Sequence, residues 1–553
     1  MTRTMQSRSL TSGVALLSAI ALAGIGAGTP ALAKALSKRP WSGAAHNPYF
    51  HTHASTTHGA VTVDGHTIHY QAVAGMIVVH GPGWNDATDA YGSGQPSPAK
   101  AKRTQSEAAM FYVAYFKDGA KPSKRPITFL YNGGPGSASL WLHMGAFGPR
   151  RVVTADHTQT PPAPYKLVNN EYSLLNASDL VFIDAPGTGF GRVRGPDPAK
   201  NFYGADADVH AFSQFIMKFL SKYGRWNSPK YLLGESYGTP RSAMLVNALE
   251  THHNIDFNGV ILLSAILNFD DSNGIGMARF NPGIGLPYEV SLPSFTATAW
   301  YHHELPGGEP PLKPLLAKVE HFAMTDYAQA LREGSLLSTS NFDAIAAKLH
   351  DYTGLPTGYI EKANLRVTGG EFQHQLLADT DETTGRLDSR FSGPSLNPLG
   401  QRAQYDPQSA AISSAYAAAF NDYSRKVRHF GMGLRYKMQI PVWQVWNFDH
   451  RQPGVGYALS RALNVMPDLA NAMKQDPDLK VMLNGGYFDL ATPFYEGIYE
   501  MHHLQIPRSL DKNIQYHYYK SGHMIYVRVA DLKKLHANVV AFIRQTDNLG
   551  GRS

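Results

Sequence analysis

Residues 231–238 read YLLGESYG, which is the most informative stretch of the sequence. An apolar run typical of a buried strand leads into Gly-x-Ser-x-Gly, and a helical pattern follows over residues 240–252. The small residues Gly234 and Gly238 allow a turn tight enough to expose the hydroxyl of Ser236 at the edge of a sheet. The alternative is a turn that matches five positions by chance, but the strand and helix signals on either side favour a reactive serine.

Short apolar runs that end in glycine-rich or polar turns continue on both sides of this stretch. They lie at residues 127–131, 180–183, 230–233, 260–263, 480–483 and 514–519. Helical patterns separate them, at residues 206–223, 240–252, 493–502 and 530–544. Such alternation is typical of a parallel sheet with helices on both faces. The sequence therefore predicts the α/β class and, with the serine turn, the α/β-hydrolase fold.

The alternation stops after residue 263, and about 200 residues of mainly helical pattern follow. Within them, helices are predicted at residues 312–332, 341–351 and 407–429. A chain of 553 residues can bury a large core and still carry an inserted module. We therefore predict a core in two parts, residues 58–264 and 476–553. Residues 265–475 are predicted to form an inserted helical cap with returning core segments.

The first 33 residues have the pattern of a secretory signal peptide. Arg3 and Arg8 precede an uncharged run that closes on small residues at 31–33, which predicts cleavage near Ala33. The most apolar part, residues 14–25, is shorter than the roughly 20 residues that cross a bilayer, so a retained anchor is the weaker interpretation. We expect an exported protein, periplasmic or secreted, without stable membrane insertion after cleavage. Residues 34–57 are predicted to form an N-terminal arm with little regular structure.

The composition excludes several classes of function. The chain has no cysteine, which excludes disulfides, thiol catalysis and thiolate metal sites. Its formal charge is +7 and its pI about 9.1, but no long Lys/Arg block or nucleic-acid motif is present, so a nucleic-acid partner is not expected. A group of histidines lies near the N-terminus without any partner motif that would fix a metal geometry. These are His46, His51, His53 and His58. We expect no metal and no organic cofactor, and the sequence does not indicate the oligomeric state.

A reactive serine needs two partners, because its hydroxyl is a weak nucleophile until a histidine accepts the proton and a carboxylate orients that histidine. In this fold both follow the serine, in the order Ser, Asp, His. Asp489 lies in the loop after the strand at 480–483, and His523 follows the strand at 514–519. Taken alone, His523 would be a surface histidine and Asp489 a helix cap before a proline. Their order and their positions at strand ends instead predict a triad of Ser236, Asp489 and His523.

A second glycine-rich element, NGGPG at residues 132–136, follows the strand at 127–131. Such a loop can direct backbone N–H groups at an oxyanion that develops during the reaction. A phosphate-binding loop is the competing interpretation, but the Lys and Ser/Thr that close a nucleotide loop are missing. The sequence therefore favours an oxyanion loop.

Taken together, these motifs resemble the serine carboxypeptidase family of α/β-hydrolases. They occur in the family's order as NGGPG at 132–136, GP at 148–149, DAPGTGF at 184–190, GESYG at 234–238 and GHM at 522–524. The similarity spans roughly residues 124–274 and 480–540. It implies an enzyme that releases C-terminal amino acids from peptides through an acyl-enzyme. It also implies an oxyanion hole formed by the N–H groups of Gly134 and Tyr237, and substrate binding by Asn132, Gly133, Glu235 and Met524.

One position departs from the family. Where the family has a second glutamate before Gly-Pro, this chain has Ala146. Paired carboxyls share a proton at acid pH and can then donate a hydrogen bond to a substrate carboxylate, whereas an ionised lone Glu235 would repel it. His143, Glu171 or a residue of the cap could supply the missing donor. Without one, we expect a weaker preference for free C-termini.

Two other functions therefore stay open. An esterase or acyltransferase could use the same triad, because the triad is indifferent to whether the leaving group is an amine or an alcohol. A catalytically inactive hydrolase-like binding protein of the cell envelope is the alternative from another class. The presence of a candidate residue at every triad position argues against that last function.

Overall fold

The computed structural model describes residue 50 and residues 54–85, 90–91, 106–274, 282–458 and 462–550. The predicted signal peptide, most of the predicted arm, and His46, His51 and His53 lie outside the described residues. The prediction that residues 34–57 form an arm with little regular structure was wrong for the last residues of this range. Strand β1 begins at Ala54, because residues 54–63 pair along their whole length with the next strand. In the part of the chain that the structure describes, no helix is both long and apolar enough to cross a membrane.

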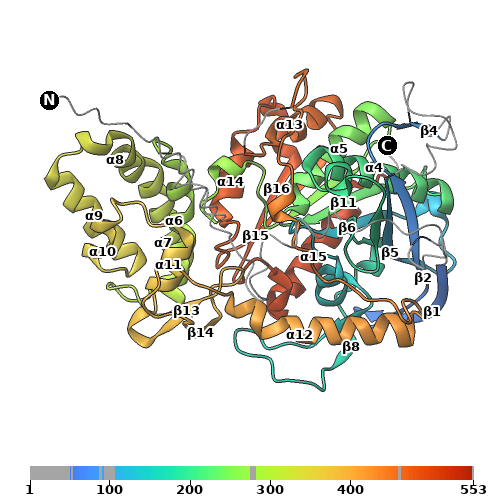
Figure 1. The fold of residues 1–553 in the computed structure, drawn as a ribbon, viewed down its shortest axis with the longest axis horizontal. Coiled ribbons are helices and arrows are strands. Elements are labelled where there is room, and N and C mark those ends of the chain that lie inside the picture. Colours follow the sequence, from blue (N-terminus) through green and yellow to red (C-terminus); the bar gives the residue numbers. More distant parts are fainter. Residues whose placement is uncertain are drawn as a thin grey trace, which may run out of the picture.

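A sheet of ten strands forms the centre of the molecule (Figure 1). Nine of them follow one another in the order β1 (Ala54–Val63), β2 (His66–His80), β5 (Glu107–Lys117), β9 (Asp179–Ile183), β6 (Ile127–Asn132), β11 (Lys230–Glu235), β12 (Gly259–Leu263), β15 (Lys480–Gly486) and β16 (Ile514–Tyr519). The tenth, β10 (Arg192–Arg194), pairs with β5. Neighbours from β9 to β16 are parallel, and β1, β2, β5 and β9 pair antiparallel. The strands predicted from the apolar runs are confirmed.

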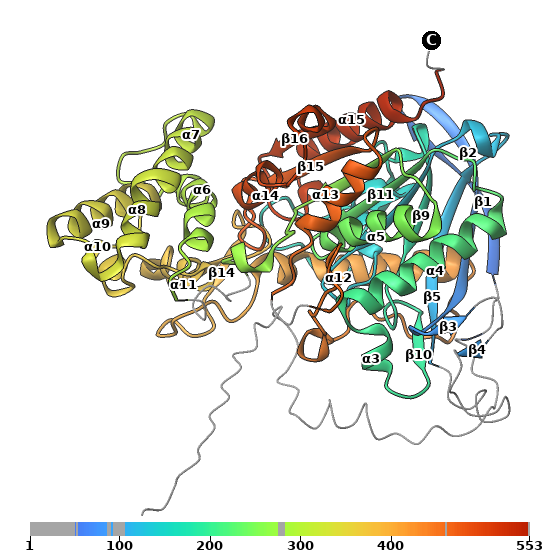
Figure 2. The same cartoon turned by 90° about the horizontal axis from the view of Figure 1, so that it is seen from above.

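Helices cover both faces of the sheet (Figure 2). The five that pack on the sheet or on one another are α4 (Ala205–Tyr223), α5 (Gly238–His253), α13 (Met466–Gln475), α14 (Phe494–His502) and α15 (Val529–Thr546). Successive residues of β11 belong to different cores: Leu232 packs in the cluster with Phe212 of α4, and Leu233 in the cluster with Leu535 of α15. Because both faces are covered there, the central strands β9, β6, β11 and β12 are buried along nearly their whole length, as parallel strands in this class are. The predicted α/β-hydrolase class is confirmed.

The helical insertion forms a separate lobe beside the sheet (Figure 1). Its helices are α6 (Leu286–Tyr301), α7 (Leu312–Phe322), α8 (Ala328–Glu333), α9 (Thr339–Thr353), α10 (Thr357–Lys362) and α11 (Gly369–Gln375). The lobe has its own core, in which the rings of Phe295 and Phe372 stack with centroids 4.2 Å apart. Ala297 and Leu312 pack against Phe488 of the body, so the lobe lies next to the loop that follows β15. The single helix predicted at 312–332 is interrupted by a π-helical turn at Ala323–Tyr327.

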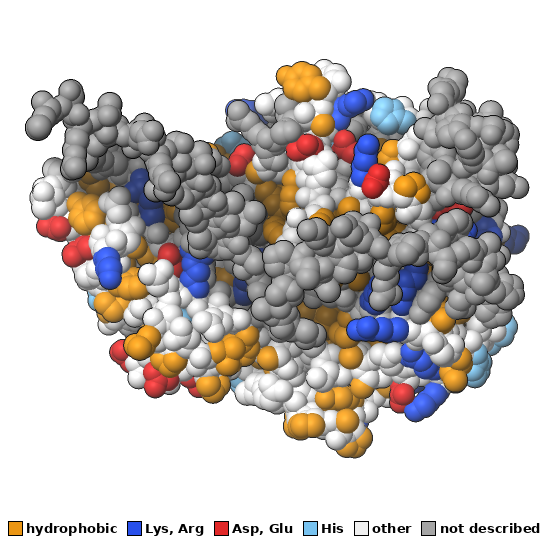
Figure 3. Space-filling model, viewed as in Figure 1, with side chains coloured by type: hydrophobic (Ala, Val, Ile, Leu, Met, Phe, Trp, Pro, Cys, Tyr) orange, Lys and Arg blue, Asp and Glu red, His pale blue; other side chains and the backbone are white. Residues whose placement is uncertain are grey.

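The rest of the insertion returns to the body. A hairpin, β13 (Glu382–Thr384) and β14 (Ser392–Pro394), precedes α12 (Pro407–Asp422), which runs along the body in Figure 1. Smaller elements complete the described fold: β3 (Trp84–Asn85), β4 (Ala90–Tyr91), β7 (Arg150–Val152), β8 (Leu167–Asn169) and α3 (Pro198–Phe202). On the face drawn in Figure 3, Lys and Arg side chains lie on both the lobe and the body, and on the lobe they are mixed with Asp and Glu.

Candidate active site

The serine turn has the strained backbone that its sequence predicts. Ser236 follows the last residue of β11 with φ at 61°, in the left-handed region, which is unfavourable for a residue with a Cβ. Its N–H donates to the carbonyl oxygen of Leu263 in β12 at 3.0 Å. A Cβ on Gly234 would lie 2.0 Å from the carbonyl oxygen of Gly238, so only glycine fits there. Ser236 therefore lies between β11 and α5, at the carboxyl ends of the parallel strands.

The NGGPG loop packs directly on this turn. A Cβ on Gly133 would lie 2.3 Å from the backbone nitrogen of Tyr237, which leaves no room for a larger residue. The N–H groups of Gly134 and Tyr237 donate to no other group within the described chain, and both residues line the same pocket as Ser236. Two free backbone donors beside a serine hydroxyl can stabilise negative charge on an oxygen atom bound between them.

A buried ion pair supports the start of the NGGPG loop. Arg241 of α5 donates from Nη1 to the carbonyl oxygen of Asn132 at 3.0 Å. Its Nε donates to Asp208 of α4 at 2.5 Å, and both side chains of this pair are fully buried. The guanidinium of Arg241 therefore connects the end of β6 to α4 and α5.

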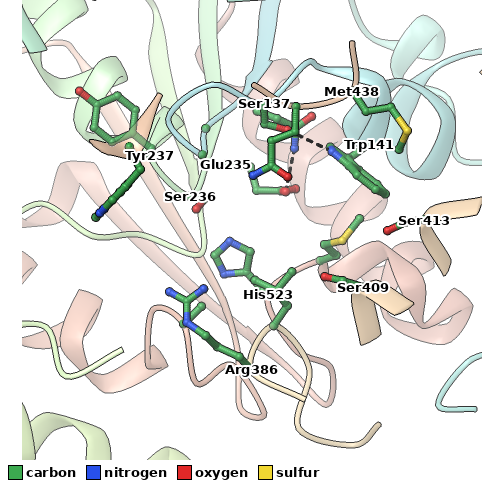
Figure 4. Close-up of a pocket in the computed structure, with 18 of the residues that line it drawn as sticks. Ser137, Trp141, Glu235, Ser236, Tyr237, Arg386, Ser409, Ser413, Met438 and His523 are labelled. Carbon is green, nitrogen blue, oxygen red and sulfur yellow. Dashed lines mark hydrogen bonds between the residues drawn. The ribbon is translucent and has the colours of Figure 1, made fainter. Parts of the chain in front are cut away.

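His523 and Asp489 lie together across the pocket. His523 Nδ1 and Asp489 Oδ2 are 2.8 Å apart. The Asp489 carboxylate accepts three further hydrogen bonds, from the N–H groups of Ala491 and Thr492 and from the hydroxyl of Thr492. The carboxylate is therefore held rigidly, and with its oxygens satisfied it can orient the histidine ring. Figure 4 shows the ring of His523 between Ser236 and the loop that carries the histidine.

The charges around His523 make it a stronger base. Burial lowers the pKa of His523, but the charge of Asp489 and the hydrogen bond to it, with a further contribution from Glu235, outweigh burial and leave the pKa raised above 6.5. The structure has no hydrogen bond between Ser236 Oγ and His523. Such bonds are often long in ligand-free enzymes and shorten when substrate binds.

Glu235 and Asn132 form a second polar pair beside Ser236. Asn132 Nδ2 donates to Glu235 Oε1 at 2.7 Å, and Asn132 Oδ1 accepts from the N–H of Leu142 at 3.1 Å. Glu235 Oε2 is buried and makes no hydrogen bond of good geometry among the described residues, although the Tyr526 hydroxyl lies close enough to interact with this carboxyl. Burial raises the pKa of the Glu235 carboxyl to about 7, and the interactions with His523, Tyr526 and Asn132 lower it by less than burial raises it. Below that pH the group is neutral and can donate a hydrogen bond to an anion.

The structure does not bring His143 or Glu171 to this pair. His143 is buried and bonds through Nε2 to the hydroxyl of Tyr115 at 2.6 Å, and Glu171 is exposed to solvent. Ala146 is fully buried and does not line the pocket. The space beside its neighbour Gly145 is filled by two tyrosine rings, from α12 and from the loop after His523. These are Tyr416 and Tyr526, and both are electrostatic neighbours of Glu235.

A pocket of about 440 Å³ connects these groups. Of the predicted site residues, eight line it: Asn132, Gly133, Gly134, Glu235, Ser236, Tyr237, His523 and Met524. Asp489 lies behind His523. Among the other lining residues, sequence reasoning missed Thr492, which bonds to Asp489, and Arg386, which is labelled in Figure 4. Thr492 stands three positions after Asp489, where a turn-forming carboxylate commonly bonds, but no local motif marks Arg386.

Part of the chain is similar in sequence to a family of known proteins. The family model described as serine carboxypeptidase matches residues 100–284, which include the glycine-rich loop and the serine turn. Over these residues the chain is similar to the serine carboxypeptidase family. Asp489 and His523 lie outside the matched range, so their pairing rests on the geometry given above.

The curated relatives of this chain are distant, and each of them matches only part of it. Serine carboxypeptidase-like 36 of Arabidopsis thaliana is 27% identical over 195 residues, which cover 33% of this chain and 38% of the relative. Carboxypeptidase Y of Saccharomyces cerevisiae is 24% identical over 155 residues, or 28% of this chain and 27% of the relative. The chain thus matches well under half of the length of either relative.

A solved structure of similar arrangement is the proline iminopeptidase of Mycobacterium smegmatis. It is 13% identical, with a TM-score of 0.34, and the match covers 85% of this chain and 99% of that one. The α/β-hydrolase fold is assigned from the order and the pairing of the strands. No group of three or more His, Asp or Glu side chains within the described ranges is arranged to hold a metal ion.

Proposed function

We propose that this chain is a serine carboxypeptidase that hydrolyses peptides at the C-terminus through a Ser236–His523–Asp489 triad. The observation that carries the proposal is the 2.8 Å hydrogen bond between His523 and Asp489, at a pocket that also holds Ser236 and the free N–H groups of Gly134 and Tyr237. A nucleophile, a base with its orienting carboxylate, and two oxyanion donors are the parts that acyl transfer requires.

In the acylation step, His523 Nε2 accepts the proton of Ser236 while the serine oxygen attacks the carbonyl carbon of the scissile bond. The carbonyl oxygen becomes negatively charged, and the N–H groups of Gly134 and Tyr237 stabilise it. When the C–N bond breaks, His523 returns the proton to the leaving amine. The acyl group is then esterified to Ser236.

In the deacylation step, water takes the place of the amine. His523 accepts a proton from the water, whose oxygen attacks the ester carbonyl, and the same oxyanion donors stabilise the second tetrahedral intermediate. The C–O bond to Ser236 breaks, the serine oxygen regains its proton from His523, and the shortened peptide leaves with a new carboxylate. No cofactor takes part in these steps.

Asn132 and Glu235 are proposed to hold the carboxylate of the leaving amino acid. Glu235 Oε2 makes no hydrogen bond of good geometry within the described chain, where the Tyr526 hydroxyl is its neighbour, and the carboxyl is neutral below about pH 7 because burial raises its pKa. A neutral carboxyl donates to the substrate carboxylate, whereas an ionised one repels it. This would let a single glutamate do what two do elsewhere in the family.

The test is the product pattern from peptides with free and with amidated C-termini. Mass spectrometry at pH 6 should show loss of one C-terminal amino acid at a time from the free peptides and slower cleavage of the amides. Cleavage at internal bonds, or no cleavage of any peptide, would contradict the proposal. The absence of a second glutamate favours one competitor, an esterase or acyltransferase, which would instead turn over esters much faster than any peptide.

We also propose that the protein is exported and that the mature chain begins near Lys34. The proposal rests on the basic start, the apolar run and the small residues at 31–33 of the sequence. N-terminal sequencing of protein from the producing cell tests it. A start near Lys34 is expected, and a retained Met1 would contradict export.

A further inference from the structure

The charges that line the pocket are mostly positive. Three cationic side chains, those of Arg386, Arg435 and Lys437, line it, and Glu235 is the one carboxyl group among its described lining residues. Since burial raises the pKa of Glu235 to about 7, this carboxyl compensates only part of the positive charge near neutral pH. A pocket with this balance attracts anionic substrates.

Arg386 is the cation built most closely into the catalytic loops. The N–H of Leu490 donates to the carbonyl oxygen of Arg386 at 3.1 Å, and the N–H of His523 donates to that of Leu387 at 2.6 Å. The loop with Asp489 and the loop with His523 therefore both bond to the backbone at this point. The position of Arg386 relative to the reacting groups is fixed by main-chain contacts.

The guanidinium of Arg386 is left without a counter-ion. Its Nε donates to the carbonyl oxygen of Gly274 at 3.0 Å, and no ion pair joins it to any carboxylate among the described residues. The carboxylates that influence its charge are Asp406 and Asp489. Both already accept from other donors, Asp406 from the backbone N–H of Arg386 and the hydroxyl of Ser409, Asp489 from the donors described above.

An unpaired, partly buried guanidinium has lost hydration without gaining a partner. Its planar fork of N–H donors matches the two oxygens of a carboxylate. A carboxylate that enters with the substrate would supply the partner that the chain does not.

The place of Arg386 indicates which part of the substrate it faces. Arg386 and Glu235 lie on opposite sides of His523 in Figure 4. The charges of both residues influence the pKa of His523, but Arg386 and Glu235 do not influence the pKa of each other. If Glu235 holds the carboxylate of the leaving amino acid, the acyl part of the peptide extends past Ser236 toward Arg386.

We propose that Arg386 determines specificity by forming an ion pair with an acidic side chain on the acyl part of the substrate. The chain then favours peptides whose penultimate residue is Glu or Asp. This inference rests on the proposed carboxypeptidase function, because it needs the leaving carboxylate at Asn132 and Glu235.

The test compares N-blocked dipeptides that differ only in charge, with Glu or Gln as the penultimate residue and the same C-terminal residue. The wild-type protein should show a kcat/KM ratio of Glu to Gln of at least about ten at pH 7, as expected for a charge-assisted pair. In Arg386→Met the ratio should fall to about one, mainly through KM, and Arg386→Lys should keep part of it. A wild-type ratio near one would overturn the proposal even if Arg386→Met failed to fold.

Arg402→Met is the matched control. Arg402 pairs with Glu371 at 3.5 Å and does not line the pocket, so its loss should leave the ratio at the wild-type value. If Arg402→Met lowered the ratio as much as Arg386→Met, general surface charge would be responsible and the proposal would be wrong.

Two further arms separate other roles of Arg386. Amidated dipeptides test whether Arg386 binds the terminal carboxylate. If Arg386→Met changed the preference for free over amidated ends but not the Glu to Gln ratio, the acyl-side assignment would be overturned.

A pH profile tests whether Arg386 only adjusts the pKa of His523. An equal shift of the profile for both dipeptides, with an unchanged Glu to Gln ratio, would also overturn the assignment. Cleavage of both dipeptides without preference refutes this inference alone. No cleavage, with no labelling of Ser236 by a phosphonate, refutes the proposed function with it.

Discussion

Gly133 and Tyr237, from two loops that are a hundred residues apart in the chain, are in direct backbone contact: a Cβ on Gly133 would lie 2.3 Å from the Tyr237 nitrogen. That nitrogen belongs to the proposed oxyanion hole. The contact sets the distance between the glycine-rich loop and the serine turn.

Gly133→Ala should therefore impair catalysis more than folding. The added methyl must displace backbone atoms rather than a flexible side chain, and the loss of one oxyanion donor commonly costs about 10²–10³ in kcat. Measurement of kcat together with the urea midpoint checks this. Activity near the wild-type value would show that the loop can move away without loss, and would argue against Gly134 and Tyr237 as fixed donors.

Thr492→Val tests whether the orientation of Asp489 matters. The Thr492 hydroxyl donates to Asp489 Oδ2 at 2.8 Å and lies 3.2 Å from His523 Nδ1. Its removal should lower kcat by about tenfold and the free energy of unfolding by about 1 kcal/mol, the usual value for one hydrogen bond. Thr492→Ser keeps the hydroxyl and should behave nearly as wild type. Equal activity of the valine and serine variants would contradict this role.

The pH dependence should separate catalysis from carboxylate binding. His523 must be neutral to act as base, and its raised pKa means that turnover of amidated peptides falls as pH drops through a value above 6.5. Glu235 must be neutral to bind a carboxylate, so the preference for free over amidated ends should fall as pH rises through about 7.

Glu235→Gln is the control for the effect of pH on the preference for free over amidated C-termini. Glutamine is neutral at every pH, so the preference should lose its dependence on pH between about 6 and 8 while the His523 effect remains. If the preference in this variant kept the pH dependence of the wild type, another group would control carboxylate binding.

Ala146→Glu tests the departure from the family. Ala146 is fully buried beside Gly145, where Tyr416 and Tyr526 fill the space. A buried carboxyl there should lower the free energy of unfolding by about 3 kcal/mol or more, measured by urea titration. Normal stability with a stronger free-carboxylate preference at pH 5 would instead show that the family's acid pair can form on this backbone.

Local patterns were enough to predict the sheet and most of the site. The strand, glycine and helix signals around Ser236 are contiguous in sequence, and strand ends in a parallel sheet meet at one edge, which brings Asp489 and His523 to Ser236. Arg386 could not be found in this way. Arg386 lines the pocket because the chain that returns from the helical lobe forms hydrogen bonds with the loops that carry Asp489 and His523. The periodicity of the sequence does not indicate a tertiary contact of this kind.

The same limit explains the tyrosines near Glu235. Tyr416 lies on α12, a helix that sequence reasoning placed in the insertion, and only the packing of α12 against the body brings it near Gly145. The π-helical interruption at Ala323–Tyr327 has no proline or glycine to mark it in the sequence. Elements that depend on long-range packing are therefore the ones that the sequence left undetermined.

The rate of peptide hydrolysis by Ser236→Ala tests most directly whether Ser236 is the nucleophile, with Ser221→Ala on the outer side of α4 as a matched control. Ser221 bonds to Met217 of its own helix and lies outside the pocket, so its variant should keep the wild-type rate. Ser236→Ala should keep the fold by circular dichroism and lose kcat by a factor on the order of a million. Hydrolysis by folded Ser236→Ala at a rate near the wild-type value would show that Ser236 is not the nucleophile.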